Sequence, residues 1–350
     1  MRFSFTFEQE ALGEAVGRCI AKHVPTWPDR RWVDVEALAR SLVLPLAELG
    51  VPGIMVPEEK GGSGLGIVDA VPAIAAAAHL MGPYPFVDML VASHAISSID
   101  HDAAPGIRDG QNIAVVAWDT SLQVTKLGDG LTGVVTASAY GGMARWLLAP
   151  VHRDNQIEGA VLVDLTESSV KRTSVEMFDL TAPVCRIEIN NVQSGGRIDR
   201  AAWLKYVKIA RVLYAADMIG SATRAHELAL GYLRTRSQFG KAIGENQSLR
   251  HMVADDHLRL ENGKLAVAQA AWAIDADDQS LELAVLTAKA YASRAARLVA
   301  ENAIQIHGGI GFTWDMPLHP LLRRILRVGG ILGTPPQLFS DIGRLIAPLR

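Results

Sequence analysis

The sequence predicts a multidomain protein of the α+β class, in which a helical domain, a β domain and a second helical domain follow one another. Two observations predict this class. The hydrophobic period changes twice along the chain, and both outer zones carry long stretches with apolar residues at helical spacing. At 350 residues the chain is long enough for two or three domains. The predicted domains are residues 1–110, 111–197 and 198–350.

Each zone is recognised by its own pattern. The first has helical spacing in "VEALARSLVLPLAELG" and "IVDAVPAIAAAAHLMG", separated by the turn-rich "PEEKGGSGLG". The second shortens to β-branched runs such as "NIAVVAW" and "GAVLVDLT", which predict a small antiparallel β-barrel or sandwich. In the third zone, long helical segments have alanine and leucine on one face and charges on the other. Such helices are typical of an antiparallel bundle that also contributes to oligomerisation.

Composition and charge indicate an ordinary soluble globular protein, with 49% hydrophobic residues, 20% charged residues and a net charge of −3. Because there is no basic excess, neither nucleic acid nor a membrane surface is expected as a partner. Cys19 and Cys185 are far apart, and the histidines at 79, 94, 101 and 152 lack ligand spacing, so core thiols are expected rather than a disulfide or a metal site. Acids and glycines near the N-terminus do not suit a signal peptide, and no apolar run is long enough for a membrane span. We therefore expect a cytoplasmic protein.

Three motifs stand out from this background: "LAELGVPGIMVPEEKGGSGLG" at 46–66, "RTRSQFGKAIGENQ" at 234–247 and "QIHGGIGFT" at 305–313. Each has a local interpretation. The first is a helix followed by a turn, the second is a helix C-terminus with Gly240 as its cap, and the third is a glycine cap after a helix. The local interpretations do not explain why all three occur together in this order and at these separations.

With these three motifs the chain resembles the acyl-CoA dehydrogenase family of flavoproteins over its whole length. "RSQFG" followed by Gln247 is similar to the family's R-x-x-F-G…Q signature, and "QIHGGIGFT" is similar to its Q-x-x-G-G-x-G-[FY] signature. The resemblance implies an N-terminal helical domain, a middle β domain and a C-terminal four-helix bundle. It also implies FAD as the cofactor and an acyl-CoA thioester as the substrate.

The resemblance further implies which residues contact FAD. In the family, the bundle signatures contact the ADP half of a flavin that is held mainly by the neighbouring subunit. The chemistry suits this role, because a guanidinium forms paired bonds to a diphosphate and glycine exposes backbone N–H groups. The cofactor-binding residues implied here are Arg236, Gln238, Phe239, Gln247, Gln305, Gly308, Gly309 and Thr334.

The catalytic glutamate of the family has no counterpart in this chain. In family members this residue takes the α-proton of the substrate while the flavin accepts a hydride. The register places the glutamate of the family's Y-E-G-T stretch at Leu332, with Gly333 and Thr334 matching the G-T. An alternative position used by some members, an acid just before an arginine, falls on Ala210, before Arg211. Neither leucine nor alanine accepts a proton, so no catalytic residue is predicted.

The middle zone departs from the family as well. The T-E-P-x-x-G-S-D stretch that holds the flavin ring is replaced by "AWDTSLQVTKLGDG" from Ala117. The stretch "LTGVVTASAYG" at 131–141 has lost the lysine and the aromatic residue of the family's N-G-x-K-x-[WF]-I-T pattern. The chain thus retains residues donated to a neighbour's flavin and lacks those that hold its own ring.

This asymmetry predicts a degenerate subunit of a heteromeric acyl-CoA dehydrogenase, similar to the short subunits of actinobacterial steroid side-chain enzymes. The implied assembly is an α2β2 heterotetramer with a homologous catalytic subunit and about one FAD for every two chains. The implied substrate is a sterol side-chain CoA ester, and the implied electron acceptor is an electron-transfer flavoprotein. The isolated chain is expected to be inactive.

Two alternatives stay open. The chain is a self-sufficient enzyme whose base has moved to Asp217, Glu227, Asp315 or His319, or it is a scaffold relative that binds no flavin. Glu227 also fits a solvated helix face or a salt bridge, and Asp315 and His319 fit an ordinary surface turn. Asp217 interrupts an apolar run, so it needs a partner if it is buried. The intact Arg236, Phe239 and Gly308 argue against the scaffold.

Overall fold

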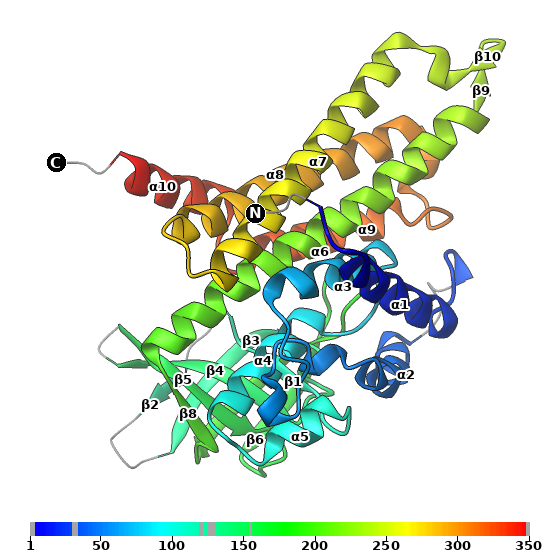
Figure 1. Ribbon diagram of the computed structural model, residues 1–350. Coiled ribbons are helices and arrows are strands. Elements are labelled where there is room, and N and C mark those ends of the chain that lie inside the picture. The colour runs from blue at the N-terminus through cyan, green and yellow to red at the C-terminus, as the bar shows by residue number, and fades with distance from the viewer. Residues whose placement is uncertain (1–3, 30–33, 119–121, 125–129, 154–155, 348–350) are drawn as a thin grey trace. The chain divides into compact units, whose positions relative to one another are not determined.

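The computed structural model (Figure 1) describes residues 4–29, 34–118, 122–124, 130–153 and 156–347. Helices occupy the chain up to Arg108, strands lie between Ala114 and Asp199, and helices return from Arg200. This order confirms the predicted fold class. The chain divides into two compact units, Met1–Val33 with Val71–Gly82 and Arg211–Arg350, and Asp34–Ala70 with Pro83–Ala210. Because each unit draws on separate stretches of chain, the three predicted domain boundaries stay a prediction.

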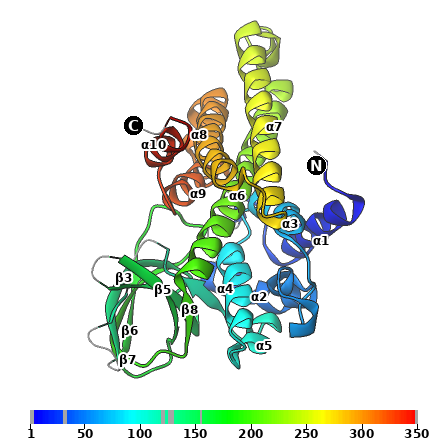
Figure 2. The ribbon, with the colours of Figure 1, turned by 60° about the vertical axis from the view of Figure 1, so that its left-hand side comes forward.

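The first unit is helical. Its main helices are α1 (Phe7–His23), α3 (Ile67–His79, from Val71 onward), α6 (Arg200–Thr235, from Arg211 onward), α7 (Gln247–Asp275), α8 (Leu281–His307), α9 (Leu318–Gly330) and α10 (Pro335–Ile346). The long helix α7 packs along α8, and α8 also contacts α9 and α10 (Figure 2). Half of the buried residues of α8 are alanines, and their small side chains let neighbouring helices approach closely.

Helix ends in this unit follow local capping rules. Thr6 begins α1 with a capping box, in which its Oγ1 accepts from the Gln9 N–H at 3.3 Å and the Gln9 Oε1 accepts from the Thr6 N–H at 2.8 Å.

Glycine is needed where α3 and α6 meet, because a Cβ added at Gly220 would lie 2.3 Å from the Ala75 carbonyl oxygen. Backbone contact, rather than side-chain interdigitation, therefore joins these two helices.

The second unit combines short helices with a sheet. Its helical segments are α2 (Val35–Glu48), η2 (Val51–Gly53), η3 (Glu58–Lys60), α4 (Phe86–Ser98) and α5 (Ala103–Arg108). The described strands form one sheet in the order β6-β7-β3-β2-β4-β5-β8, with β1 also paired to β4. Their bounds are β1 (Ala114–Val116), β2 (Leu122–Val124), β3 (Leu131–Ala139), β4 (Trp146–Arg153), β5 (Gln156–Asp164), β6 (Val170–Val175), β7 (Val184–Val192) and β8 (Gly196–Asp199).

The prediction of a purely antiparallel β domain is wrong in one respect. Strands β1 and β2 both run parallel to β4, although the other pairings within this sheet are antiparallel. The physical reason is connectivity: the chain reaches β4 from β2 by way of β3, and such a crossover permits parallel pairing that a tight hairpin does not. Of the stretch that replaces the family's ring-holding motif, residues 119–121 and 125–129 lie outside the described residues.

Neither Cys19 nor Cys185 forms a disulfide with a described residue, and burial raises the pKa of Cys185 to about 11. Among the described residues no three His, Cys, Asp or Glu side chains gather as metal ligands. None of the helices in the described part of the chain combines the length and apolar character that a membrane span requires. The predicted cytoplasmic location stays a prediction.

Candidate functional site

The segment that carries Arg236 begins at a helix C-terminus, as the local interpretation expects, with Arg234 in the last turn of α6, and continues as a hairpin. Helix α6 ends at Thr235, and residues 237–242 form two short strands, β9 (Ser237–Gln238) and β10 (Lys241–Ala242). Phe239 and Gly240 link them with φ angles of 53° and 81°. Two consecutive residues with positive φ are the mark of a two-residue turn that matches strand twist. The interpretation of Gly240 as a helix cap is therefore wrong.

The second glycine motif lies at the end of α8, which contacts the last turns of α6. Helix α8 ends at His307, and a short 3-10 segment, η5 (Gly308–Phe312), follows. The His307 ring stacks on the Tyr232 ring with centroids 4.3 Å apart, and Tyr232 lies one turn before Arg236. The His307 Nδ1 donates to the Ala303 carbonyl oxygen at 2.8 Å, and burial lowers the pKa of the imidazole. This stack fixes the end of α6 against the end of α8.

We call the exposed residues at this end of the bundle the tip surface. The Phe239 side chain is 99% exposed, and a Cβ added at Gly240, Gly308 or Gly309 would meet no atom within 4 Å. Arg236 forms no ion pair with any described residue. None of these features is explained by packing within the chain. The tip surface comprises Arg236, Gln238, Phe239, Gln247, Gln305, Gly308 and Gly309.

The tip surface has the chemistry that an ADP group needs. It presents one guanidinium, three carboxamides and two glycines whose backbone is open to solvent. A guanidinium forms charge-assisted bonds to phosphate oxygens, and an exposed glycine backbone approaches a ligand without steric hindrance. Phe239 adds an apolar side chain suited to a partner surface. These residues therefore fit the diphosphate end of FAD.

Thr334 lies elsewhere, in the loop between α9 and α10. It precedes α10, and both its N–H and its hydroxyl donate to Gln337 Oε1, at 2.9 and 2.8 Å. Just before it, Leu332 is buried with a φ of 60° and Gly333 has a φ of 116°. A bulky residue rarely adopts a positive φ, so surrounding contacts must hold Leu332 in this conformation.

Two cationic side chains fix the Leu332 loop. Arg211 Nε donates to the Leu332 carbonyl oxygen at 3.1 Å, and burial lowers the pKa of the guanidinium. On the other side, the fully buried Lys289 donates from Nζ to the carbonyl oxygens of Val328 at 2.9 Å and Gly329 at 3.4 Å. A cation at these carbonyls stabilises the C-terminal end of α9. These bonds hold Leu332 itself and the helix end that precedes it.

The predicted cofactor residues thus fall into two groups. Arg211 holds the Leu332 loop, and Arg236 lies on the tip surface 25 residues further along the chain. At the α-helical rise this corresponds to roughly 37 Å. The structure brings seven of the predicted residues to one end of the bundle and leaves Thr334 apart from them.

Asp217 is not available as a base. Arg324 Nε donates to its Oδ1 at 3.0 Å and Arg324 Nη2 donates to its Oδ2 at 2.5 Å. Both side chains are buried, and Arg324 also donates to the Gly82 carbonyl oxygen at 3.4 Å. The expectation that a buried Asp217 needs a partner is confirmed. Its partner is an arginine that occupies both carboxylate oxygens.

The other acid and base candidates have structural partners or lie in solvent. Glu227 Oε2 accepts from His79 Nε2 at 2.7 Å, which confirms the salt-bridge interpretation. Asp315 is exposed. The expected surface placement of His319 is wrong, because its side chain is buried with the ring 4.4 Å from that of Trp314 in an edge-on contact. Burial, aided by the charge of Arg323, lowers the pKa of His319.

Sequence reasoning missed Lys289, Arg324 and the role of Arg211. Lys289 is the lone cation in the otherwise apolar run "LAVLTAKAYA", which was a usable signal because a buried lysine needs acceptors. Arg324 sits beside Arg323 in "LLRRILRV", and only helix phase distinguishes the buried guanidinium from the one nearer the surface.

Comparisons with known proteins agree with this architecture. Residues 6–101 match the model of the acyl-CoA dehydrogenase N-terminal domain, and residues 201–342 match that of the C-terminal domain. Acyl-CoA dehydrogenase FadE34 of Mycobacterium tuberculosis is 33% identical over 298 residues, which cover 82% of this chain. The chain spans only 39% of the length of FadE34.

Two solved structures are similar over nearly the whole chain. The ChsE4-ChsE5 complex from Mycobacterium tuberculosis has a TM-score of 0.89 at 24% identity, with full coverage of both chains. The Tcur3481-Tcur3483 steroid ACAD, solved as a G363A variant, has a TM-score of 0.86 at 25% identity and covers 97% of this chain and 98% of its own. Together with the two domain matches, these similarities show that the chain belongs to the acyl-CoA dehydrogenase family, whose members are FAD-binding flavoproteins.

Proposed function

We propose that this chain is a subunit of a heteromeric acyl-CoA dehydrogenase that lends its tip surface to the FAD of a homologous catalytic subunit. The observation that carries the proposal is Leu332, which occupies the position that the family resemblance assigns to the catalytic glutamate. Its side chain has no atom that accepts a proton, so the base must come from another chain.

The conformation of the Leu332 loop supports loss of a base rather than loss of the loop. Leu332 keeps a positive φ that leucine disfavours, and Gly333 and Thr334 complete the turn into α10. Arg211 donates to the Leu332 carbonyl oxygen, and Lys289 donates to the end of α9 just before it. A loop under no structural constraint would adopt a backbone conformation that its side chains favour, and it would not keep a leucine at positive φ.

The tip surface supports a role in trans. Its residues are exposed, and Arg236 lies roughly 37 Å along α6 from the Leu332 loop. In the proposed assembly Arg236 would hold the diphosphate, for which a guanidinium is suited, and the open backbone at Gly308 and Gly309 would leave room for it. Bound FAD supplies the hydride acceptor of the reaction. The residues of this chain bind and orient it.

The relatives support the finer parts of the proposal. Two similar structures are named as pairs of chains, and one of them is described as a steroid ACAD. We therefore propose an α2β2 assembly with a homologous catalytic subunit, acting on a sterol side-chain CoA ester and passing electrons to an electron-transfer flavoprotein.

The proposal is tested by expressing the chain alone and together with a homologous subunit encoded nearby. We expect the isolated chain to bind little FAD and to catalyse no dehydrogenation, and the complex to carry about one FAD for every two chains. Full FAD occupancy and dehydrogenation by the isolated homomer would refute the proposal and favour a self-sufficient enzyme. A colourless, inactive complex would favour a scaffold.

A matched pair of variants separates flavin contact from general surface effects. Arg236→Ala in the complex removes the proposed diphosphate contact, so FAD is expected to dissociate more readily during dialysis. Arg234→Ala removes an exposed arginine two residues earlier on α6, outside the tip surface, and should leave FAD occupancy unchanged. Equal FAD retention in both variants contradicts the role given to Arg236.

A further inference from the structure

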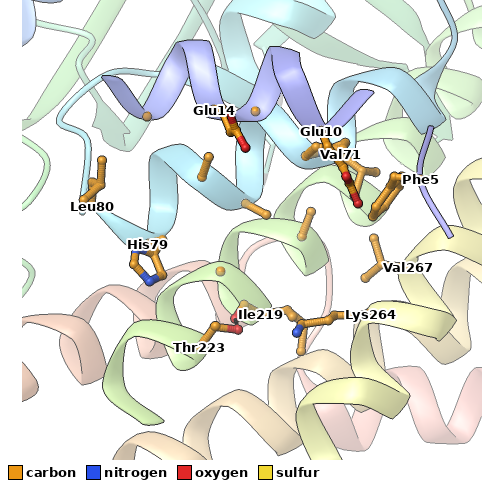
Figure 3. Close-up of a pocket in the computed structure, with 17 residues that line it drawn as sticks. Phe5, Glu10, Glu14, Val71, His79, Leu80, Ile219, Thr223, Lys264 and Val267 are labelled. Carbon is orange, nitrogen blue, oxygen red and sulfur yellow. Dashed lines mark hydrogen bonds between the residues drawn. The ribbon is translucent and has the colours of Figure 1, made fainter. Parts of the chain in front are cut away.

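A cavity of about 550 Å³ lies between α1, α3, α6 and α7 of the first unit (Figure 3). Its volume falls in the range of small-molecule sites. The walls are mostly apolar and consist of glycines and alanines on three of the helices, with Ile219 from α6 and Val267 from α7. No residue of the tip surface and none of the Leu332 loop lines it.

Helix packing explains some of the small residues around the cavity but not its open space. A Cβ added at Gly220 would lie 2.3 Å from the Ala75 carbonyl oxygen, and one at Gly13 would lie 3.0 Å from the Pro72 carbonyl oxygen. These glycines permit close backbone approach. At Gly17, in contrast, the nearest atom to an added Cβ would be Leu80 Cδ1 at 3.9 Å. Gly17 therefore borders space that another side chain, or a ligand, has room to fill.

Most polar and charged groups at the cavity already have a partner within the protein. Lys264 Nζ lies 2.7 Å from Glu261 Oε1, and His79 Nε2 lies 2.7 Å from a Glu227 carboxylate oxygen. The Glu14 carboxylate lies 3.2 Å from the guanidinium of its i+4 neighbour on α1. A ligand charge placed next to any of these groups would compete with an existing partner.

Glu10 is the exception. It forms no ion pair with any described residue, and it projects from α1 toward the cavity beside the Phe5 ring (Figure 3). A carboxylate next to an aromatic face suits an ammonium group, which gains from both the negative charge and the ring quadrupole. A ligand carboxylate would meet like charge from Glu10 and Glu14.

We propose that this cavity binds a small amphiphilic cation, a compact apolar body with one ammonium group. The apolar body lies against the walls around Gly17 and Ala76, where its burial removes apolar surface from water. The ammonium lies at Glu10 and Phe5. The site is separate from the flavin contacts and requires neither FAD nor a catalytic partner.

The ligand class is tested by calorimetric titration of the full chain with three probes of equal chain length: decylammonium, 1-decanol and decanoate, each below its micelle concentration. We expect decylammonium to bind most tightly and decanoate most weakly. Glu10→Gln should weaken decylammonium binding by about two- to fivefold, as for an exposed ion pair, and leave decanol unchanged. Glu8→Gln removes a charge from the same helix outside the cavity and serves as the control.

The location is tested by filling the cavity from two walls. Gly17→Leu from α1 and Ala76→Leu from α3 should each abolish binding of all three probes, whereas Gly231→Leu on an open face of α6 should not. Thermal unfolding identifies any variant that fails to fold. If one of the two filling variants does not fold, the other one decides whether filling the cavity abolishes probe binding. Normal binding in a folded filled variant, equal affinity for decanoate and decylammonium, or no binding of any probe overturns the proposal. The titration is independent of flavin content and of Leu332, so its failure leaves the proposed function untouched.

Discussion

Asp217→Asn is expected to destabilise the fold, because the Asp217–Arg324 pair is a structural element rather than part of a proton-transfer site. The two side chains are only 7% and 4% exposed, and the arginine donates to both carboxylate oxygens. Asparagine keeps one acceptor oxygen but removes the compensating charge, which leaves a buried guanidinium unpaired. Removing one partner of a buried pair costs about 3–5 kcal/mol, and the remaining acceptor places the expected loss near 3 kcal/mol.

The measurement is the free energy of unfolding from denaturant titration, with Asp341→Asn as the control. The Asp341–Arg344 pair has a similar distance of 2.9 Å, but its side chains are 41% and 76% exposed, so its loss should cost between about 0 and 1 kcal/mol. The double variant Asp217→Asn with Arg324→Met should recover part of the stability. An Asp217→Asn protein with unchanged stability and lost dehydrogenase activity would refute the argument and favour a displaced base.

Three further predictions follow from buried groups. Lys289→Met keeps the volume but leaves the Val328 carbonyl oxygen without its buried donor, so denaturant titration should show a loss of about 1–3 kcal/mol. Burial, followed by the charge of Lys205, lowers the pKa of His94 to about 4. As the pH falls from 6.5 towards 4, the His94 imidazole therefore takes up a proton in the unfolded chain before it does so in the folded protein. The free energy of unfolding should fall by up to about 1.4 kcal/mol per pH unit in this range, and His94→Asn should flatten that slope. Gly220→Ala should lower the melting temperature markedly, because no methyl group fits 2.3 Å from the carbonyl oxygen it faces.

The fold class was accessible from the sequence because it depends on a local signal. The change from helical spacing to short β-branched runs near residue 111, and back near residue 198, is visible within windows of a dozen residues. The parallel pairing of β1 and β2 with β4 was not accessible, because strand direction depends on which strands meet and not on their composition.

For the candidate site, too, residues carried by short motifs could be predicted, whereas features that depend on tertiary contacts could not. Short motifs carry Arg236 and Gly308 and therefore predict them, but the same sequence predicts Gly240 as a helix cap, since a glycine with positive φ suits both a cap and a hairpin turn. Asp217 was singled out correctly, whereas its partner lies 107 residues away and no local pattern connects them. His319 was expected at the surface because its packing against Trp314 is tertiary.

The hairpin of the tip surface, residues 237–242, sits at the end of a two-helix arm, where α6 and α7 continue past the end of α8 (Figures 1 and 2). The hairpin at its end touches little of its own chain, with Phe239 almost fully exposed and open space around Gly240. Backbone amides in such a place exchange with solvent through local fraying, whatever the stability of the core. Slow deuterium uptake at residues 236–242 would therefore report a bound neighbour. Hydrogen exchange can thus detect assembly at this hairpin, even where deuterium uptake in the rest of the bundle does not change.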